Sequence, residues 1–175
     1  MVHRALLLLA ALPLLLASPA PTGHGVWPLP APHDVVHGFD PPDSTYGPGH
    51  RGVDLAGHPG EIVRAALAGT VVFAGPLAGR GVVVVDHGSV RTTYEPVAAS
   101  VHVGDPVAAG GAIGLLTLTQ SHCFPVACLH WGLIRNSDDV YLDPLTLVQA
   151  APIRLLPLWR ELPWGLPIAV PLAQL

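Results

Sequence analysis

The chain has 175 residues, of which 50% are hydrophobic and 11% charged, and this suits one folded domain with tails rather than a disordered protein. Its 20 prolines and 19 glycines break long helices and favour short strands joined by tight turns. The formal net charge is −4, and all 8 basic residues are arginines without any cluster, which argues against nucleic acid as a partner.

The N-terminus has the features of a secretory signal peptide. A basic start, Met1–Arg4, precedes the apolar run Ala5–Ala17 and then small residues. We expect residues 1–20 to be removed and the product to be secreted. The apolar run is short for a membrane span and is interrupted by Pro13, so no transmembrane segment is expected after cleavage. The alternative is an uncleaved anchor.

Short β-like runs follow a Pro-rich lead-in, residues 21–48. Their β-branched residues, and turn signals at intervals of about 8–12 residues, predict an all-β domain: a small antiparallel sandwich or barrel-like sheet. The lead-in itself has few periodic apolar positions and is expected to be extended. The β-like runs are Glu61–Ala66, Gly69–Gly75, Arg80–Gly88, Ser89–Val97, Ala99–Val107, Gly110–Leu116 and Ala127–Arg135, and Tyr141–Val148 closes the domain.

Residues 149–175 form an apolar tail of different character. Prolines recur along it, so a continuous membrane-spanning helix is not expected. It also lacks the basic face of a helix that lies on a membrane surface. We expect a flexible tail or a strap packed on the domain, with an interfacial or partner-binding segment as the alternative.

The stretch "GHRGVDLAG", Gly49–Gly57, contains a possible metal-binding pair. In an extended segment His50 and Asp54 point to the same side, because side chains alternate between the two faces of a strand. Gly52 between them leaves room beside an ion. Imidazole nitrogen and carboxylate oxygen are both zinc ligands. The alternative is a polar surface turn.

A third candidate ligand lies in "CLHWGL", Cys128–Leu133. His130 would share a strand face with Cys128, while Trp131 would point to the core. A buried histidine needs a partner for its ring nitrogens, and a metal ion supplies one. Together with His50 and Asp54 it would leave one coordination position for water, which is the catalytic type of zinc site.

These segments resemble the lysostaphin/LytM-type zinc metallopeptidases, which cut peptides of bacterial peptidoglycan. The resemblance covers Trp27–Leu147 and rests on "GHRGVDLAG", "GEIVRAALAGTVVFAG", "VVVVDHG…RTTYEPV", "VHVGDPVAAGGAIG" and "CLHWGL" in this order. It implies that residues 49–148 form a small antiparallel β domain whose groove holds one Zn²⁺. It also implies that His50, Asp54 and His130 are the zinc ligands.

Two positions depart from the family pattern. The family usually carries helper histidines where this chain has Cys128 and Pro96. General acid–base help contributes about 10²- to 10⁴-fold, so its loss would slow a peptidase without abolishing it. His122 is a candidate substitute, with a solvent-facing loop histidine as the alternative. Tyr94 is a candidate groove residue that offers its hydroxyl to the substrate, or else a half-buried strand aromatic.

The two cysteines have competing interpretations. An exported chain with an even cysteine count favours a Cys123–Cys128 disulfide, which would hold His122 near the groove. Alternatively, a Cys128 thiolate would be a fourth ligand and would make a closed, structural zinc site. The motif "HDVVH", His33–His37, resembles a metal pair four residues apart, but its Pro-rich setting disfavours that role.

The sequence therefore predicts a secreted zinc endopeptidase that acts on peptidoglycan peptides in the cell wall. The alternative is a catalytically weakened module of the same fold, which would bind the wall or activate a partner hydrolase.

Overall fold

The computed structural model describes residues 25–31, 34–44, 47–148, 160–161 and 167–168, so the expected signal peptide and most of the tail lie outside the described residues. All strand pairs are antiparallel, which confirms the all-β prediction. The elements are β1 Val35–His37, β2 Val53–Gly57, β3 Ile62–Arg64, β4 Gly69–Leu77, β5 Arg80–Asp86, β6 Val90–Glu95, β7 Val97–Ala99, β8 Pro106–Val107, β9 Ala112–Leu116, β10 Ala127–Arg135, β11 Tyr141–Leu142, the 3-10 helix η1 Pro144–Leu147, β12 Arg160–Glu161 and β13 Pro167–Ile168.

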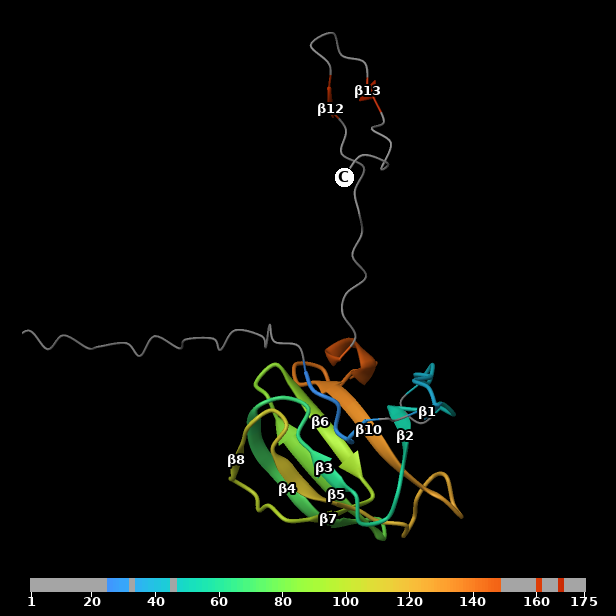
Figure 1. The fold of residues 1–175 in the computed structure, drawn as a ribbon, viewed down its shortest axis with the longest axis vertical. Coiled ribbons are helices and arrows are strands. Elements are labelled where there is room, and N and C mark those ends of the chain that lie inside the picture. The colour runs from blue at the N-terminus through green and yellow to red at the C-terminus, as the bar shows by residue number, and fades with distance from the viewer. Residues whose placement is uncertain (1–24, 32–33, 45–46, 149–159, 162–166, 169–175) are drawn as a thin grey trace, which may run out of the picture.

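The large sheet has eight strands in the order β1-β2-β10-β6-β5-β4-β8, with β11 paired to β10. β10 crosses this sheet between β2 and β6 (Figure 1). All of its residues except Arg135 are buried, as expected for a nearly continuous apolar strand that is covered on both faces. Polar side chains of β10 and of its neighbour β2 therefore project from strands inside the sheet.

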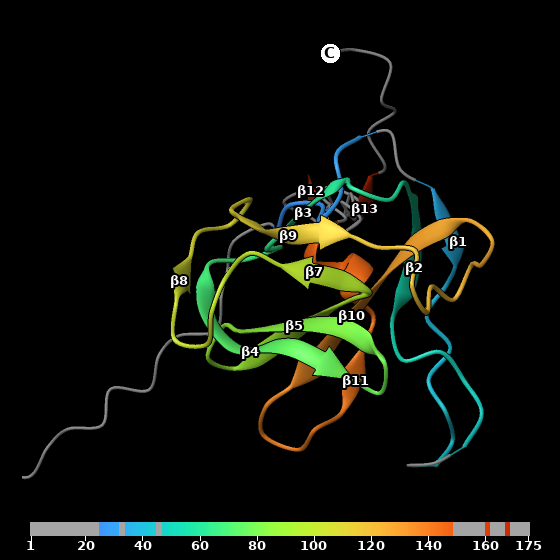
Figure 2. The same cartoon turned by 90° about the horizontal axis from the view of Figure 1, so that it is seen from below.

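A smaller sheet, with the order β3-β9-β7, lies over the β4 and β5 side of the large one (Figure 2). The core fills the space between the two sheets. It consists of the inward-facing residues of both, among them the fully buried Val53, Leu55, Val63, Val83, Val85, Tyr94, Ile113, Leu129 and Trp131. The expected core position of Trp131 is confirmed.

The lead-in contributes more to the fold than its Pro-rich composition predicts. Leu29 is 1% exposed and belongs to the core. The Trp27 ring lies 6.3 Å from that of Trp131. Further along, β1 adds an edge strand to β2. The described residues of the lead-in are therefore part of the folded domain.

The expected run Ala99–Val107 is wrong as a single strand. β7 ends at Ala99 and β8 begins at Pro106, with a turn between them in which the Asp105 amide bonds to the His102 carbonyl. Gly104 has φ +96°, which a continuous strand does not allow. No helix in the described part of the chain has the length and hydropathy of a membrane span.

Candidate metal site

The structure brings His50, Asp54 and His130 together at one end of the β2–β10 ladder. Asp54 and His130 are directly opposite each other in this ladder, so their side chains share a face. His50 precedes β2 and is held by a backbone bridge to Asp40. All three side chains are buried, with 6%, 1% and 9% exposure for His50, Asp54 and His130.

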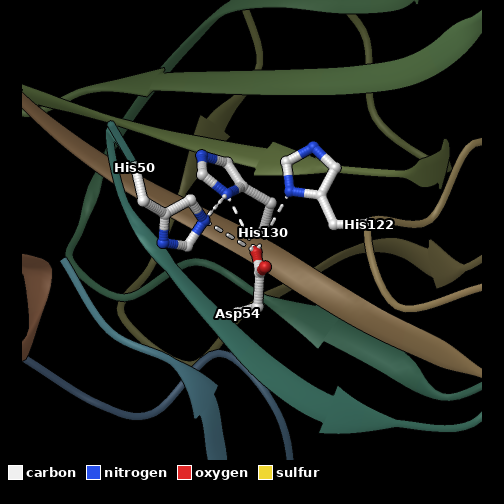
Figure 3. Close-up of side chains that lie close together, drawn as sticks. All are labelled: His50, Asp54, His122 and His130. Carbon is white, nitrogen blue, oxygen red and sulfur yellow. Dashed lines mark hydrogen bonds and ion pairs between the residues drawn. The ribbon is translucent and has the colours of Figure 1, made fainter. Parts of the chain in front are cut away.

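The ligand atoms of these residues point at one another (Figure 3). His50 Nε2 lies 3.2 Å from Asp54 Oδ1 and 3.0 Å from His130 Nδ1, and His130 Nδ1 lies 3.0 Å from the same carboxylate oxygen. His122 approaches from the exposed side, with Nδ1 at 3.4 Å from Oδ1. Three imidazoles thus converge on one carboxylate oxygen.

This spacing suits a small tetrahedral cation. Nitrogen and oxygen ligands about 2.0–2.2 Å from zinc lie about 3.3 Å from one another at the tetrahedral angle. The donor atoms of His50, Asp54, His122 and His130 all lie within 4.8 Å of one another. Two neutral imidazoles and a carboxylate are a donor set that zinc accepts, so these residues fit the metal that the sequence predicts.

Two glycines give the site its space. A Cβ atom at Gly52 would lie 2.8 Å from His130 Nε2 and 2.5 Å from the Trp131 carbonyl oxygen. Gly49 has φ +151°, and a Cβ there would lie 2.6 Å from the Asp40 carbonyl oxygen. Any larger residue at Gly49 or Gly52 would displace the segment that carries His50 or the His130 ring.

Hydrogen bonds and nearby charges determine which ring nitrogen of His50 is free to bind a metal and whether Asp54 is ionised. The Gly38 carbonyl accepts a hydrogen bond of 2.7 Å from His50 Nδ1, which leaves Nε2 free to be a ligand. Burial alone would raise the pKa of Asp54, but hydrogen bonds from His122 and His130 and the nearby imidazole charges lower that pKa well below its usual range. Asp54 is therefore a carboxylate at neutral pH.

A cross-linked loop delivers His122 to this cluster. The disulfide joins Cys123, the next residue, to Cys128 at the start of β10. Ser121 Oγ accepts hydrogen bonds from the backbone amides of both cysteines and donates one to the Val126 carbonyl. The bond to Asp54 raises the pKa of His122, although burial partly opposes this.

The disulfide prediction is confirmed, and the alternative of a Cys128 thiolate ligand is wrong. The Cys123–Cys128 bond is formed, with Cα atoms 5.8 Å apart. Neither sulfur can then be a thiolate, although both lie within 4.8 Å of an Asp54 oxygen. The described residues contain no free cysteine.

The expectation that Tyr94 lines the groove is wrong. Its side chain is fully buried, opposite Trp131 in the β6–β10 ladder and on the core face. Its hydroxyl accepts hydrogen bonds from the Ala66 amide at 2.7 Å and from the Thr92 hydroxyl at 2.8 Å. Burial raises the pKa of Tyr94 to about 12. This hydroxyl is a structural group.

Sequence reasoning missed two features beside the cluster. Glu95 lies directly opposite His130 on the groove face and forms an ion pair of 2.9 Å with Arg80. His37 lies in β1, with Nδ1 at 3.6 Å from Asp54 Oδ2. The motif "HDVVH" indicates His37 as a candidate. Whether His37 faces the site depends on the strand register, which cannot be read from the motif.

Comparison with known proteins places this site in a family. Residues 48–144 match Peptidase family M23. An uncharacterized protein of Mycobacterium tuberculosis and another of Mycobacterium bovis are each 53% identical to this chain over 138 residues, which is 77% of this chain and 55% of the relative. The chain thus spans about half the length of the curated relatives it matches.

Solved structures share the fold. The antimicrobial peptidase lysostaphin from Staphylococcus simulans is 25% identical with a TM-score of 0.57, over 77% of this chain and 61% of that one. A peptidase M23 from Pseudomonas aeruginosa, described as putative, is 27% identical with a TM-score of 0.52, over 67% and 51% of the two chains. A chain from the structure of the SpoIIQ–SpoIIIAH pore-forming complex is 24% identical and matches in fold, with a TM-score of 0.62 over 73% of this chain and 92% of that one. The match over residues 48–144, more than half of the sequence, shows that the chain belongs to Peptidase family M23.

Proposed function

We propose that this protein is a secreted, zinc-dependent endopeptidase that hydrolyses peptide bonds in bacterial peptidoglycan. The observation that carries the proposal is the convergence of His50, Asp54 and His130, whose ligand atoms lie 3.0–3.2 Å apart in a buried corner. Family membership supports it, because M23 peptidases are in general zinc enzymes that act on peptidoglycan. The signal-like residues 1–20 support export to the cell wall.

His50, Asp54 and His130 would hold the ion, and Zn²⁺ would supply Lewis-acid chemistry that polarises a carbonyl and acidifies water. His50 is oriented by its bond to Gly38, and Asp54 by the imidazoles around it. Because Asp54 and His130 are fixed by β2 and β10, and His50 by its bridge to Asp40, they would present the ion without rearrangement.

His122 is the group that we assign to proton transfer. Its Nδ1 faces Asp54, and its other ring nitrogen points away from that carboxylate (Figure 3). From the exposed side it would accept a proton from the attacking water and return it to the leaving amine. We assign this role to His122 because Pro96 and the disulfide-bonded Cys128 carry no titrating group.

The departures from the family pattern at Pro96 and Cys128 favour a second candidate function. A module of this fold with weak catalysis would bind wall peptides or activate a partner hydrolase. His122 separates the two functions, because only the enzyme needs its imidazole.

The test measures amino groups released from peptidoglycans of several cross-link types by the zinc-loaded protein. We expect release by the wild type and none by His50→Ala, while the exposed His58→Ala behaves as the wild type. His122→Ala is expected to lower kcat by about 10²- to 10⁴-fold while it retains zinc. A wild type that binds peptidoglycan without releasing amino groups would support the binding module instead.

A further inference from the structure

The segment that precedes the family match also faces the metal site. His37 and Gly38 lie outside the matched residues 48–144, yet both touch a candidate ligand. Gly38 accepts the His50 Nδ1 bond through its backbone, which any residue can provide. His37 contributes a side chain, so its contacts are specific to its identity.

A β-bulge turns His37 toward the site. Val35 is opposite Leu55, so a regular antiparallel register would place Val36 opposite Asp54 and His37 opposite the core residue Val53. The observed register is irregular and places His37 opposite Asp54. One inserted residue thus exchanges a valine for an imidazole beside the carboxylate, and bulges commonly re-aim side chains in this way next to active sites.

His37 makes two contacts with the candidate ligands. Its ring is stacked on that of His50, with centroids 3.9 Å apart and planes 5° from parallel. Its Nδ1 lies 3.6 Å from Asp54 Oδ2, whereas His50, His122 and His130 all face Oδ1. Asp54 Oδ1 therefore faces the imidazoles of the cluster, and Asp54 Oδ2 faces His37.

His37 does not belong to the ligand cluster itself. The donor atoms of His50, Asp54, His122 and His130 lie within 4.8 Å of one another, and this group does not include His37. The His37 side chain is 61% exposed, so it contributes little to the core. Its contacts are with one ligand ring and one ligand carboxylate.

We propose that His37 is a positioning residue that holds the His50 ring and the Asp54 carboxylate in the orientation needed for zinc. The proposal rests on the zinc site of the proposed function. Partners behind metal ligands typically contribute about 10- to 100-fold to metal affinity, because they fix the orientation of the ligands. The segment before the family match would then tune the metal site.

Zinc affinity, measured by competition with a chromophoric chelator, tests this without any need for hydrolysis. We expect His37→Ala to lower the affinity by about 10- to 100-fold. His37→Phe keeps a ring for stacking and His37→Gln keeps a donor for Oδ2, so each should retain part of the affinity. His102→Ala is the matched control, because His102 is 91% exposed and lies in the turn before β8, at the opposite end of the sheet.

Thermal unfolding of the metal-free variants separates positioning from folding. We expect all four variants to unfold at the wild-type temperature, because neither His37 nor His102 is buried. Equal zinc affinities of His37→Ala and His102→Ala would overturn the inference, and so would a wild type that binds no zinc. A zinc-loaded wild type that leaves peptidoglycan uncut would overturn the proposed function alone.

Discussion

The two faces of the β2–β10 ladder show how one pair of strands serves both folding and chemistry. On the core face, Leu55, Leu129 and Trp131 are fully buried among apolar neighbours. On the groove face, Asp54 and His130 are almost as buried but lie among polar groups. Alternation along a strand separates the two environments by one residue.

This difference predicts where the stability of the fold resides. The core face gains free energy from apolar burial, at about 25 cal/mol per Å² of surface removed from water. On the groove face, the mutual hydrogen bonds of Asp54 and the imidazoles mainly offset the cost of burying polar groups. Substitutions on the core face should therefore destabilise the protein, and substitutions on the groove face should affect metal binding.

The largest effect on stability is expected for Trp131→Ala. Trp131 is fully buried and contacts Trp27, so we expect the free energy of unfolding to fall by about 3–5 kcal/mol. Urea unfolding of the metal-free protein measures it. His130→Ala, one residue away on the groove face, is the control, with a smaller expected loss of about 1.5–3 kcal/mol, because its hydrogen bond is to the Asp54 carboxylate. Equal losses for the two variants would remove the distinction between the faces.

The disulfide is the main covalent constraint on the groove side. Replacing Cys123 and Cys128 together by serine opens a short loop, and the loss of this constraint on the unfolded chain should cost about 2 kcal/mol. Zinc affinity should be unchanged, because the candidate ligands lie outside the loop. Hydrolysis should fall, because the loop delivers His122. A double variant that loses zinc would show that the loop also shapes the ligand cluster.

Tyr94→Phe tests a residue that faces the core although the sequence suggested the groove. Removing the hydroxyl leaves the buried Ala66 amide without its acceptor, so we expect a loss of about 1–2 kcal/mol in the free energy of unfolding. Zinc affinity and hydrolysis by the folded protein should remain at wild-type values. If hydrolysis falls while unfolding is unchanged, Tyr94 belongs to the groove after all.

The fold class could be predicted from the sequence because apolar alternation and turn residues are local signals. The candidate ligands His50, Asp54 and His130 could be proposed because residue types and spacing carry the resemblance. Tyr94 was misplaced because its face depends on the cross-strand register, which pairs it with Trp131 and pairs Glu95 with His130.

His37 was missed for a related reason. It faces the site only because of a β-bulge, and a short Pro-rich segment does not show from its sequence where a bulge occurs. The disulfide was predictable from composition and export, whereas the hydrogen bonds of Ser121 that shape its loop depend on the folded backbone.

The smallest effects concern pH, where His87 and His122, which lie in different surroundings, should act in opposite directions. Burial lowers the pKa of His87, which bonds to the Ala68 carbonyl and the Thr92 hydroxyl, whereas the bond to Asp54 raises the pKa of His122. Unfolded histidine has a pKa of about 6.5. His122 therefore stabilises the metal-free fold below that pH, and this contribution is lost as the pH rises through its folded pKa. His87 has the opposite sign, because its cost to the folded state appears as the pH falls below about 6.5.

Urea midpoints of the metal-free protein, measured between pH 5 and pH 8, check these signs. This range brackets the pKa of unfolded histidine, about 6.5. Relative to the wild type, His122→Ala should make stability rise more with pH, because the group that favours low pH is gone. His87→Ala should make it rise less. Each variant is the control for the other, because the two variants share every titrating group except His87 and His122. If the urea midpoints of the two variants depended on pH in the same way, the surroundings of His87 and His122 would not shift the two pKa values in opposite directions.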